Sequence, residues 1–486
     1  MKNYFLILTL LSVTLVINAQ VIPDTLWTKT YGGLGADLGI SMQKTFDNGF
    51  ILTGNTWSFG SGCTDVWLIK TDEFGNEEWN QTFGGSNNDY AHSIMQTSDF
   101  GYIVAGTTSS YGAGESDGWL LKIDENGIEE WNQTFGQEEY DGAFSVQQTI
   151  DGGYVITGYS FVSIEDQTDS WLIKTDEFGN EEWSQTFGGN ADDQTYCVQQ
   201  TSDNGFILTG STRSYGSGSG DAWLIKTDEF GNEEWNHTFG GSGGDFSHSV
   251  QQTIDGGYIL TGYTNTFATS YSDAWLIKTD ENGIEEWSQI FDTGSDEESR
   301  SVQQTIDGGF IIAGSTNNFS YFEGDILILK TDAIGNEEWR KIYGDSGIDR
   351  AHSIQQISEN DFAVLGFTQS TGSADFWFLR LGLVTGINNN FLPDNRIIVN
   401  NFPNPFNPST TIEFSIQNNS KVNLSVYNIK GQNIKTIANN EFTKGSHSVI
   451  WNGNDESENP VSSGIYFYKL FINGKTEAVN KCLLLK

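Results

Sequence analysis

Short apolar runs alternate with polar turn segments along most of the chain. Val, Ile, Phe, Tyr, Trp and Thr fill the runs, and Gly, Asp and Asn fill the segments between them. This pattern predicts β-strands joined by turns. In one stretch it predicts strands at residues 196–201, 206–210, 222–227 and 233–239. Tight turns join the first two and the last two strands, so we expect a four-stranded antiparallel meander.

The meander recurs at a constant step of 52 residues. The step is set by Trp27, Trp79, Trp131, Trp183, Trp235, Trp287 and Trp339. A period of this length indicates stacked supersecondary units, and repeated four-stranded units are typical of a β-propeller. The first unit begins with a lone fourth strand around Trp27, and the last unit lacks one. We therefore expect an all-β, seven-bladed propeller over residues 20–383, closed by its N-terminal strand.

The turn at residues 72–79 resembles the Trp-docking motif of quinoprotein propellers, in which the indole packs between neighbouring blades. It is one residue shorter than that motif between the acid and the glycine. It also resembles the Asp-box of sialidase-type propellers, with one residue more at the same place. Both resemblances imply a propeller, and neither carries over an activity.

Beyond residue 383 the period stops. We expect a linker at 384–400 and a small β-sandwich at 401–486, because short strands alternate with turn signals there. Four motifs occur in order: NPFNPST at 404–410, VYNIKGQ at 426–432, WNG at 451–453 and PVSSGIYFY at 460–468. A hydrophobic tail with a basic end follows them.

This C-terminal run resembles the type A sorting domain of the type IX secretion system, and it is also similar to the Ig-like domain of flagellar hook-capping proteins. The resemblance implies passage through the periplasm and the outer membrane, with the type IX machinery as partner and a secreted or cell-surface product. In that family the domain is commonly removed. The residues that carry the resemblance are Asn404, Pro405, Phe406, Asn407, Pro408, Gly464, Tyr466 and Lys486.

Residues 1–19 have the order of a signal peptide: Lys2, an apolar core at 5–16 and a small residue, Ala19, before the cleavage point. No later segment is apolar enough to span a bilayer, so the mature chain is expected to be soluble and exported. The net charge of −40 argues against nucleic acid and against anionic membrane surfaces. The three cysteines are too scattered for a disulfide framework.

An acid precedes the first and the third strand of every unit. Sevenfold presence points to turn capping and blade-to-blade pairing with the repeated basic residues, rather than to a catalytic pair. No cofactor is expected, and calcium at these Asp-rich loops is the alternative left open. The two series are Asp37, Asp89, Asp141, Asp193, Asp245, Glu297 and Asp349, and Asp65, Asp117, Asp169, Asp221, Asp273, Asp325 and Asp375.

Function is expected where the copies differ, in the long loops and at the mouth of the expected channel. Aromatic side chains there could stack on sugars or anchor a protein, or pack the loops together. They are Trp57, Tyr90, Tyr111, Tyr140, Tyr196, Tyr215, Phe246 and Tyr271. His92, His248 and His352 share one position in their repeats, but their spacing around the ring disfavours a common zinc ion.

These features predict a secreted or surface-displayed, non-enzymatic binding propeller for an extracellular glycan or protein. The alternative is an enzyme acting on extracellular polysaccharide. Two acids on the loop face with raised pKa values and a separation of about 5–10 Å would favour the enzyme. Inner walls of Gln, Ser and small residues would favour binding.

Overall fold

The computed structural model of the chain describes residues 22–484, apart from a set of short segments. All regular secondary structure in the described residues is β-strand, and among them no helix is long and apolar enough to cross a membrane. The expected signal peptide and most of the expected linker lie outside the described residues. The segments left out are 164–166, 268–271, 318–323, 345–346, 370–371, 384–398, 403–405, 407, 417–418, 429, 431, 458 and 473–474.

The chain divides after residue 385 into two compact units. In the first unit four-stranded antiparallel sheets follow one another, and we name their strands first to fourth in chain order. The first strands are β2 (Asp37–Lys44), β6 (Asp89–Gln96), β10 (Gly142–Gln148), β14 (Asp193–Gln200), β18 (Asp245–Gln252), β22 (Asp296–Gln304) and β26 (Ile348–Ser358). The second strands are β3 (Phe50–Thr56), β7 (Tyr102–Thr108), β11 (Tyr154–Ser163), β15 (Phe206–Thr212), β19 (Tyr258–Thr264), β23 (Phe310–Asn317) and β27 (Asp361–Gln369).

The third strands are β4 (Asp65–Thr71), β8 (Asp117–Ile123), β12 (Gln167–Thr175), β16 (Asp221–Thr227), β20 (Asp273–Thr279), β24 (Gly324–Thr331) and β28 (Asp375–Gly382). The fourth strands are β5 (Glu77–Phe83), β9 (Glu129–Phe135), β13 (Glu181–Phe187), β17 (Glu233–Phe239), β21 (Glu285–Phe291) and β25 (Glu337–Tyr343). The last two groups are joined into one sheet by a single parallel pair, Gly324 with Ile348.

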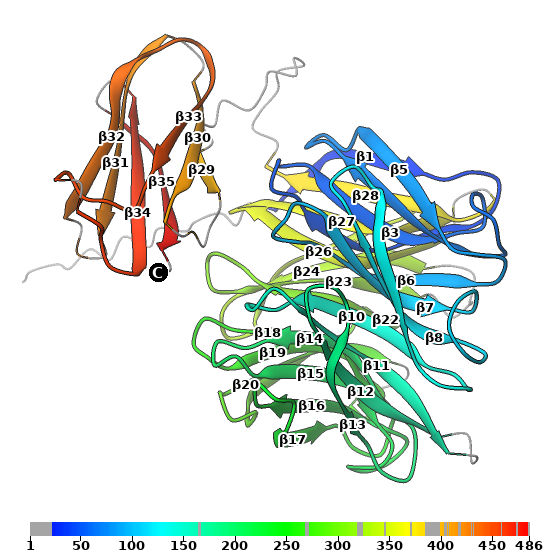
Figure 1. Cartoon of the computed structure of the whole chain (residues 1–486). Coiled ribbons are helices and arrows are strands. Elements are labelled where there is room, and N and C mark those ends of the chain that lie inside the picture. The colour runs from blue at the N-terminus through cyan, green and yellow to red at the C-terminus, as the bar shows by residue number, and fades with distance from the viewer. Residues whose placement is uncertain are drawn as a thin grey trace, which may run out of the picture. The chain divides into compact units, whose positions relative to one another are not determined.

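The N-terminal strand β1 (Asp24–Tyr31) pairs antiparallel with β28, so that Tyr31 lies opposite Phe376. In Figure 1 this places the blue start of the unit beside its yellow end. The predicted pairing of these two strands is confirmed. A backbone hydrogen bond joins the last sheet to the first: the N–H of Asp37 donates to the carbonyl of Ala374 (2.6 Å). The first and second sheets are joined in the same way, by the N–H of Asp89 and the carbonyl of Thr64 (2.8 Å).

The first strands contact one another in succession, and β26 contacts β2. A series of hydrogen bonds, here called the glutamine belt, links them: a side chain on one first strand accepts the backbone N–H of the next. Met95 takes part through its sulfur (3.4 Å), and the glutamines through their amide oxygens. The links run from Gln43 to Gln96, Met95 to Gln148, Gln147 to Gln200, Gln199 to Gln252, Gln251 to Gln304, Gln303 to Gln356 and Gln355 to Lys44.

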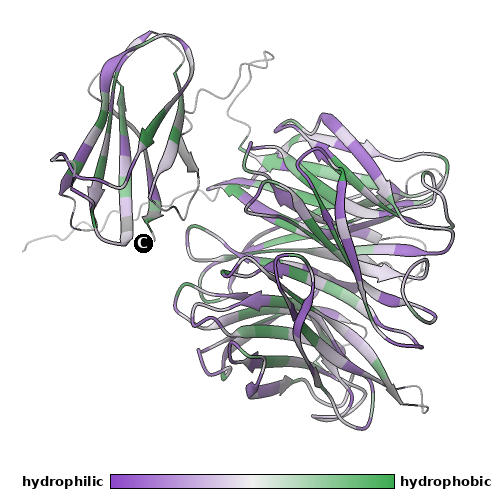
Figure 2. Ribbon diagram, viewed as in Figure 1, coloured by the Kyte–Doolittle hydropathy of each residue, from purple (hydrophilic) through white to green (hydrophobic). Residues whose placement is uncertain are grey.

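The hydrophobic core lies between neighbouring sheets. Second and third strands such as β3 and β4 are buried along their whole length, whereas the fourth strand β5 is half exposed. Figure 2 shows the corresponding green bands within the sheets and purple turns at their ends. Six of the seven repeated tryptophans, all except Trp339, pack against a turn glycine of the next sheet: a Cβ on Gly75 would overlap Trp27 of β1, and one on Gly127 would overlap Trp79 of β5. The packing expected from the Trp-docking resemblance is present.

Each third strand from β4 to β24 carries a buried lysine held by two acids of its own sheet. The Nζ of Lys70 lies 2.8 Å from Asp47 and 2.7 Å from Glu78. Five further copies repeat the arrangement, and in the last group Arg380 pairs with Asp361 at 2.6 Å. The expected blade-to-blade pairing of these cations is therefore wrong, because their partners come from the same sheet.

The second unit is a sandwich of two sheets. One sheet holds β29 (Val399–Phe402), β30 (Thr410–Ile416) and β33 (Gly445–Trp451). The other holds β32 (Asn433–Phe442), β31 (Ser420–Asn428), β34 (Gly464–Ile472) and β35 (Lys475–Leu484). Its core is built from motif residues: the buried ring of Trp451 lies 5.3 Å from that of Phe406 and 5.1 Å from that of Tyr466.

Candidate functional site

A β-bulge occurs at the same place in all seven first strands. One residue there has no partner on the second strand, which re-aims its side chain and increases the local twist. These bulge residues are Ile40, His92, Phe144, Tyr196, His248, Arg300 and His352. The bulge is not predictable from the sequence, because the strand pattern continues through it.

The bulge separates a uniform end of the first strands from a variable end. After it, serine and glutamine recur in almost every copy. The glutamines form the glutamine belt, and the serines accept further backbone N–H groups, as Ser93 does from Val146. Before it, the residue two positions earlier differs in every copy: Leu38, Tyr90, Gly142, Gln194, Phe246, Glu298 and Arg350. We call these seven residues and the seven bulge residues the variable ring. Sequence reasoning missed Gln194, Glu298 and Arg350, although aligning the repeats would have shown them.

Four adjacent first strands contribute a row of aromatic rings to the variable ring. The ring centroids of His92 and Phe144 lie 4.9 Å apart, those of Phe144 and Tyr196 5.4 Å, and those of Tyr196 and His248 5.3 Å. All four side chains are partly exposed. A neighbouring residue, Phe246, stacks on Tyr263 at 4.9 Å. The arrangement offers a continuous aromatic surface rather than isolated rings.

The next two first strands contribute charges. Oε1 of Glu298 lies 2.6 Å from the guanidinium of Arg300 and 3.1 Å from Nε2 of His248. Burial opposes ionisation of Glu298, but the contact with His248 and the charges of Arg300 and Arg350 outweigh it and lower its pKa to about 2. Glu298 is therefore ionised at neutral pH.

The three histidines of the ring have separate environments. His92 lies 3.5 Å from the hydroxyl of Thr107, His248 lies beside Glu298, and Nδ1 of His352 lies 3.1 Å from the carbonyl of Gly39. Burial lowers the pKa of His92 to about 4, and burial together with the charge of Arg300 lowers that of His352 to about 3. In the described residues these histidines do not form a common set of metal ligands.

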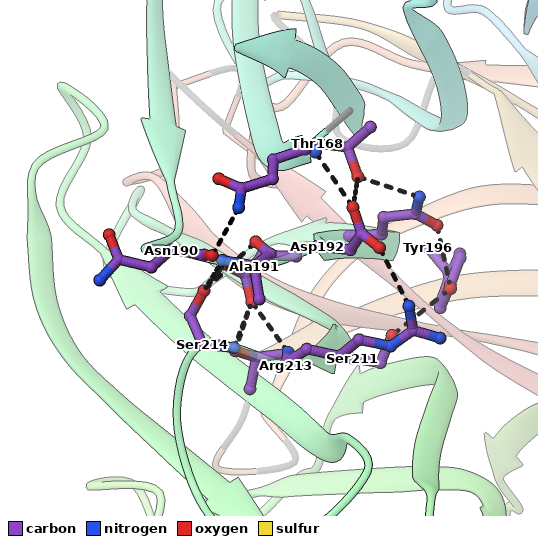
Figure 3. A network of polar contacts seen from close by, with 12 residues as sticks. Thr168, Asn190, Ala191, Asp192, Tyr196, Ser211, Arg213 and Ser214 are labelled. Atoms are coloured by element: carbon purple, nitrogen blue, oxygen red, sulfur yellow. Dashed lines mark hydrogen bonds and ion pairs between the residues drawn. The ribbon is translucent and has the colours of Figure 1, made fainter. Parts of the chain in front are cut away.

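A polar network connects Tyr196 to the loops of two neighbouring sheets (Figure 3). The Tyr196 hydroxyl donates to Gln194 (3.2 Å), and the Gln194 amide donates to the Thr168 hydroxyl (3.3 Å). Thr168 in turn donates to Asp192, whose other oxygen pairs with Arg213 at 2.9 Å. The network fixes the orientation of Tyr196, a member of the variable ring, and brings the exposed Arg213 next to it.

Two of the predicted loop aromatics, Tyr111 and Tyr215, pack against the scaffold. The hydroxyl of Tyr111 donates to the carbonyl of Gly84 (2.9 Å), and its ring lies 5.7 Å from that of Trp119. Tyr215 repeats this with Gly188 and Trp223. Both keep one side exposed, 42% and 44% respectively. The other candidates are placed as follows: Trp57 and Tyr140 are exposed, Tyr90 is half-buried on β6, and Tyr271 lies outside the described residues.

The repeated acids cap turns, as predicted. Asp89 accepts hydrogen bonds from the hydroxyls of Thr108 and Ser110 and from the N–H of Gly85. Some of these acids also lie close together at the junctions between sheets. Burial and the neighbouring Asp141 raise the pKa of Asp117 to about 6, and burial and Asp193 do the same for Asp169.

The tight turns at the other end of the sheets expose apolar side chains. In a meander the first-to-second and third-to-fourth turns lie at the same end of the sheet, so these side chains share one face. The sequence predicts these turns only as connections between strands. The exposed residues are Phe46, Phe100, Ile150, Ile254 and Ile306 in the first set of turns and Phe74, Ile128, Phe178, Phe230, Ile284 and Ile334 in the second.

Comparison with known proteins gives one family match. Residues 407–472 match the model of the FlgD Ig-like domain, in agreement with the two-sheet sandwich seen for the second unit. No curated protein sequence matches this chain. In the sandwich, Phe406 and Tyr466 are core residues, Pro408 is exposed and Gly464 begins β34. Asn404, Pro405, Asn407 and Lys486 of the predicted sorting motif lie outside the described residues.

Several solved structures are similar at low identity. PorZ of Porphyromonas gingivalis, an essential surface component of its type IX secretion system, is 12% identical over 92% of this chain, with a TM-score of 0.38. This chain spans 59% of the length of PorZ. A protein of unknown function from Dyadobacter fermentans is 10% identical over 74% of this chain and 99% of its own (TM-score 0.42). YCF48 bound to a D1 peptide is 11% identical over 76% and 100% respectively (TM-score 0.41).

Proposed function

We propose that the first unit is a closed seven-bladed β-propeller with the variable ring at the mouth of its central channel. The pairing of β1 with β28 and the glutamine belt from Gln355 to Lys44 support closure. Residues 22–383 then contain seven blades, the last one completed by the N-terminal strand.

We infer that this propeller binds an extracellular glycan or protein and does not act on it chemically. The observation that carries the inference is the confinement of repeat-to-repeat variation to one end of the first strands. A scaffold alone would need no such difference between the two ends, because the uniform end already holds the strands together. Partly exposed aromatic rings next to Glu298, Arg300 and Arg350 suit a ligand with both an apolar face and polar groups.

The polysaccharide-cleaving alternative has less support. The acids with raised pKa values all belong to the two series that recur at every junction between sheets: Asp117, Asp169, Asp221, Asp273 and Asp375 belong to one series and Glu297 to the other. A catalytic pair is a local feature of one or two blades, so the repetition favours a structural role for these acids.

The second unit is proposed to direct export through the type IX secretion system, after a signal peptide at 1–19 has led the chain to the periplasm. The Ig-like match at 407–472 and the order of the motifs support this proposal. The product is then secreted or held at the cell surface, where soluble glycans and surface proteins are available as ligands.

Binding is tested by screening the full-length protein against a glycan array and against extracellular proteins of its source. Tyr196→Ala and Arg300→Ala should each weaken any ligand found by at least about tenfold, the loss of one good contact. Ile254→Ala changes a side chain on the opposite face and serves as the control, with binding expected to equal the parent. If Ile254→Ala abolishes binding while the two ring variants do not, the variable ring is not the site.

A further inference from the structure

One junction between neighbouring sheets differs from the other six in its acids. At the other junctions a glycine follows the fourth strand, as in Gly136, where a Cβ would overlap a carboxylate oxygen of Asp117 and approach one of Asp141. After β21 the residue in this place is Asp292, and the acid on the following first strand is Glu297 instead of an aspartate. The six glycines are Gly32, Gly84, Gly136, Gly188, Gly240 and Gly344.

These two differences from the other junctions bring three carboxylates together. Asp273 begins β20, Asp292 follows β21 and Glu297 lies on β22, so two sheets contribute. One oxygen of each residue lies within 4.8 Å of the other two. Asp273 and Glu297 are buried, and Asp292 is exposed. In the part of the chain that the structure describes, this is the one such group of three.

Glu297 has an oxygen without a partner. Its side chain is 0% exposed, and Oε2 accepts no hydrogen bond from any described residue. Oε1 accepts one from the hydroxyl of Thr293. At the equivalent position Asp89 uses both oxygens, one with Thr108 and one with Ser110. A buried carboxylate oxygen left unpaired is unfavourable unless a proton or a cation compensates for it.

We propose that Asp273, Asp292 and Glu297 bind a calcium ion at the junction between β20–β21 and β22. Three carboxylates supply oxygen ligands and negative charge, which hard divalent cations require. Calcium completes a coordination of six to eight oxygens in flexible geometry, and the exposed Asp292 leaves one side open to water.

The electrostatics of the cluster agree with this assignment. Burial, together with the charges of Asp273 and Asp292, raises the pKa of Glu297, and burial and Asp292 raise that of Asp273. The neighbouring charges therefore oppose ionisation of Glu297 and Asp273, and a divalent cation would favour it by compensating the negative charge of the cluster. The ion would also connect two sheets at a junction where the glycine of the other copies is absent.

The test uses the full-length protein, stripped of metal with a chelator and titrated with calcium chloride in 0.15 M salt, about the physiological ionic strength. We expect one saturable site with a Kd on the order of 10⁻⁵ to 10⁻³ M and a higher Tm with calcium present. Asp292→Gly restores the residue of the six other junctions, so it should fold. It should lower the affinity at least about tenfold and remove most of the Tm increase.

Glu281→Gln is the matched control. Glu281 is exposed in a turn of the same sheet, and the variant loses one negative charge, as Asp292→Gly does. It should bind calcium as the parent does, which separates a specific site from general attraction to a chain of net charge −40. Equal affinity in the parent and Asp292→Gly, no saturation below about 10 mM calcium, or tighter binding of magnesium would each overturn the assignment.

Discussion

The side-chain oxygen of Gln355 accepts a hydrogen bond from the backbone N–H of Lys44, 2.7 Å away and 311 residues earlier in the chain. Six other pairs repeat this contact between consecutive first strands, with Met95 replacing a glutamine in one of them. The bond from Gln355 is the one that joins the end of the series to its beginning. A contact that would look incidental alone is thus the last member of a repeated set.

We predict that Gln355→Ala lowers the stability of the first unit. The substitution removes one partly buried hydrogen bond and leaves the N–H of Lys44 without its partner, at a cost of about 1 kcal/mol. Gln355→Met should keep part of the packing, since Met95 occupies the equivalent place. Thermal melts of the three proteins measure the difference. A Gln355→Ala protein as stable as the parent would show that the belt adds nothing at this junction.

Removal of residues 21–33 should destabilise the protein far more than removal of 384–392 from the expected linker. The first deletion exposes the edge of β28 and removes the indole of Trp27, whose ring lies 5.0 Å from that of Phe378. Loss of a buried tryptophan alone costs about 3–5 kcal/mol, and the half-buried Trp27 should fall near the lower value. Denaturant unfolding of both deletions decides the matter, and melting of both near the parent would contradict closure by β1.

Acid should weaken the first unit through the variable-ring histidines. The folded-state pKa of His92 is about 4 and that of His352 about 3, below the ordinary value of 6.5. Since the folded state binds protons less readily than the unfolded chain, the stability is complete above pH 6.5 and is lost as the pH falls toward 4. His352→Gln should reduce this loss of unfolding free energy by about 1–2 kcal/mol. Urea unfolding at pH 7.5 and pH 4.5 measures it, and identical pH dependence in variant and parent would refute the assignment.

Glu298 should also lose its stabilising contribution as the pH falls, but over a lower pH range than the histidines. Its charged form is favoured in the folded state, whereas for the histidines it is the neutral form. Its folded-state pKa of about 2 lies below the ordinary 4.3 to 4.5, so its contribution is present above pH 4.5 and lost as the pH falls through 2. Glu298→Gln should therefore destabilise at pH 7 more than at pH 2.5. Because His248 and Arg300 hold the carboxylate, a variant that is equally destabilised at both pH values would show that these contacts do not set its ionisation.

Deletion of residues 401–486 should leave the first unit folded and retain it in the periplasm. No strand of the first unit pairs with the second unit in the described residues, so the sheets do not depend on it. Fractionation of cells and medium, followed by immunoblotting, gives the distribution, and a deletion of 384–392 serves as control. Equal amounts of truncated and full-length protein outside the cell would refute the sorting role.

The strands were largely predictable because packing imposes the same pattern on every copy. The fourth strand was predicted at 233–239 and is β17 (Glu233–Phe239). The first strand was predicted from residue 196 but begins at Asp193, because Asp193 and Gln194 read as polar turn residues and yet pair with Thr212 and Ser211. The end of a strand cannot be found from the pattern of apolar residues when the terminal residues are polar, even if their backbones pair with the neighbouring strand.

The candidate site was less predictable. His92, Tyr196 and His248 were singled out, but their row of rings depends on a bulge that leaves no trace in the alternation of polar and apolar residues. Glu298 was missed since a single glutamate among 64 acidic residues does not stand out. Asp292 was missed for the same reason, although its place in the repeat belongs to glycine in the other copies.

The pairing of β1 with β28 also sets an order of events during synthesis. β1 leaves the ribosome first, and its partner follows some 350 residues later, which takes roughly 20 to 70 s at ordinary elongation rates. During that time β1 has no sheet to join, whereas the four-stranded sheets made earlier can form from local hairpins alone. The slowest and least local step of folding is therefore the last one, and a chain interrupted anywhere before residue 382 cannot complete it.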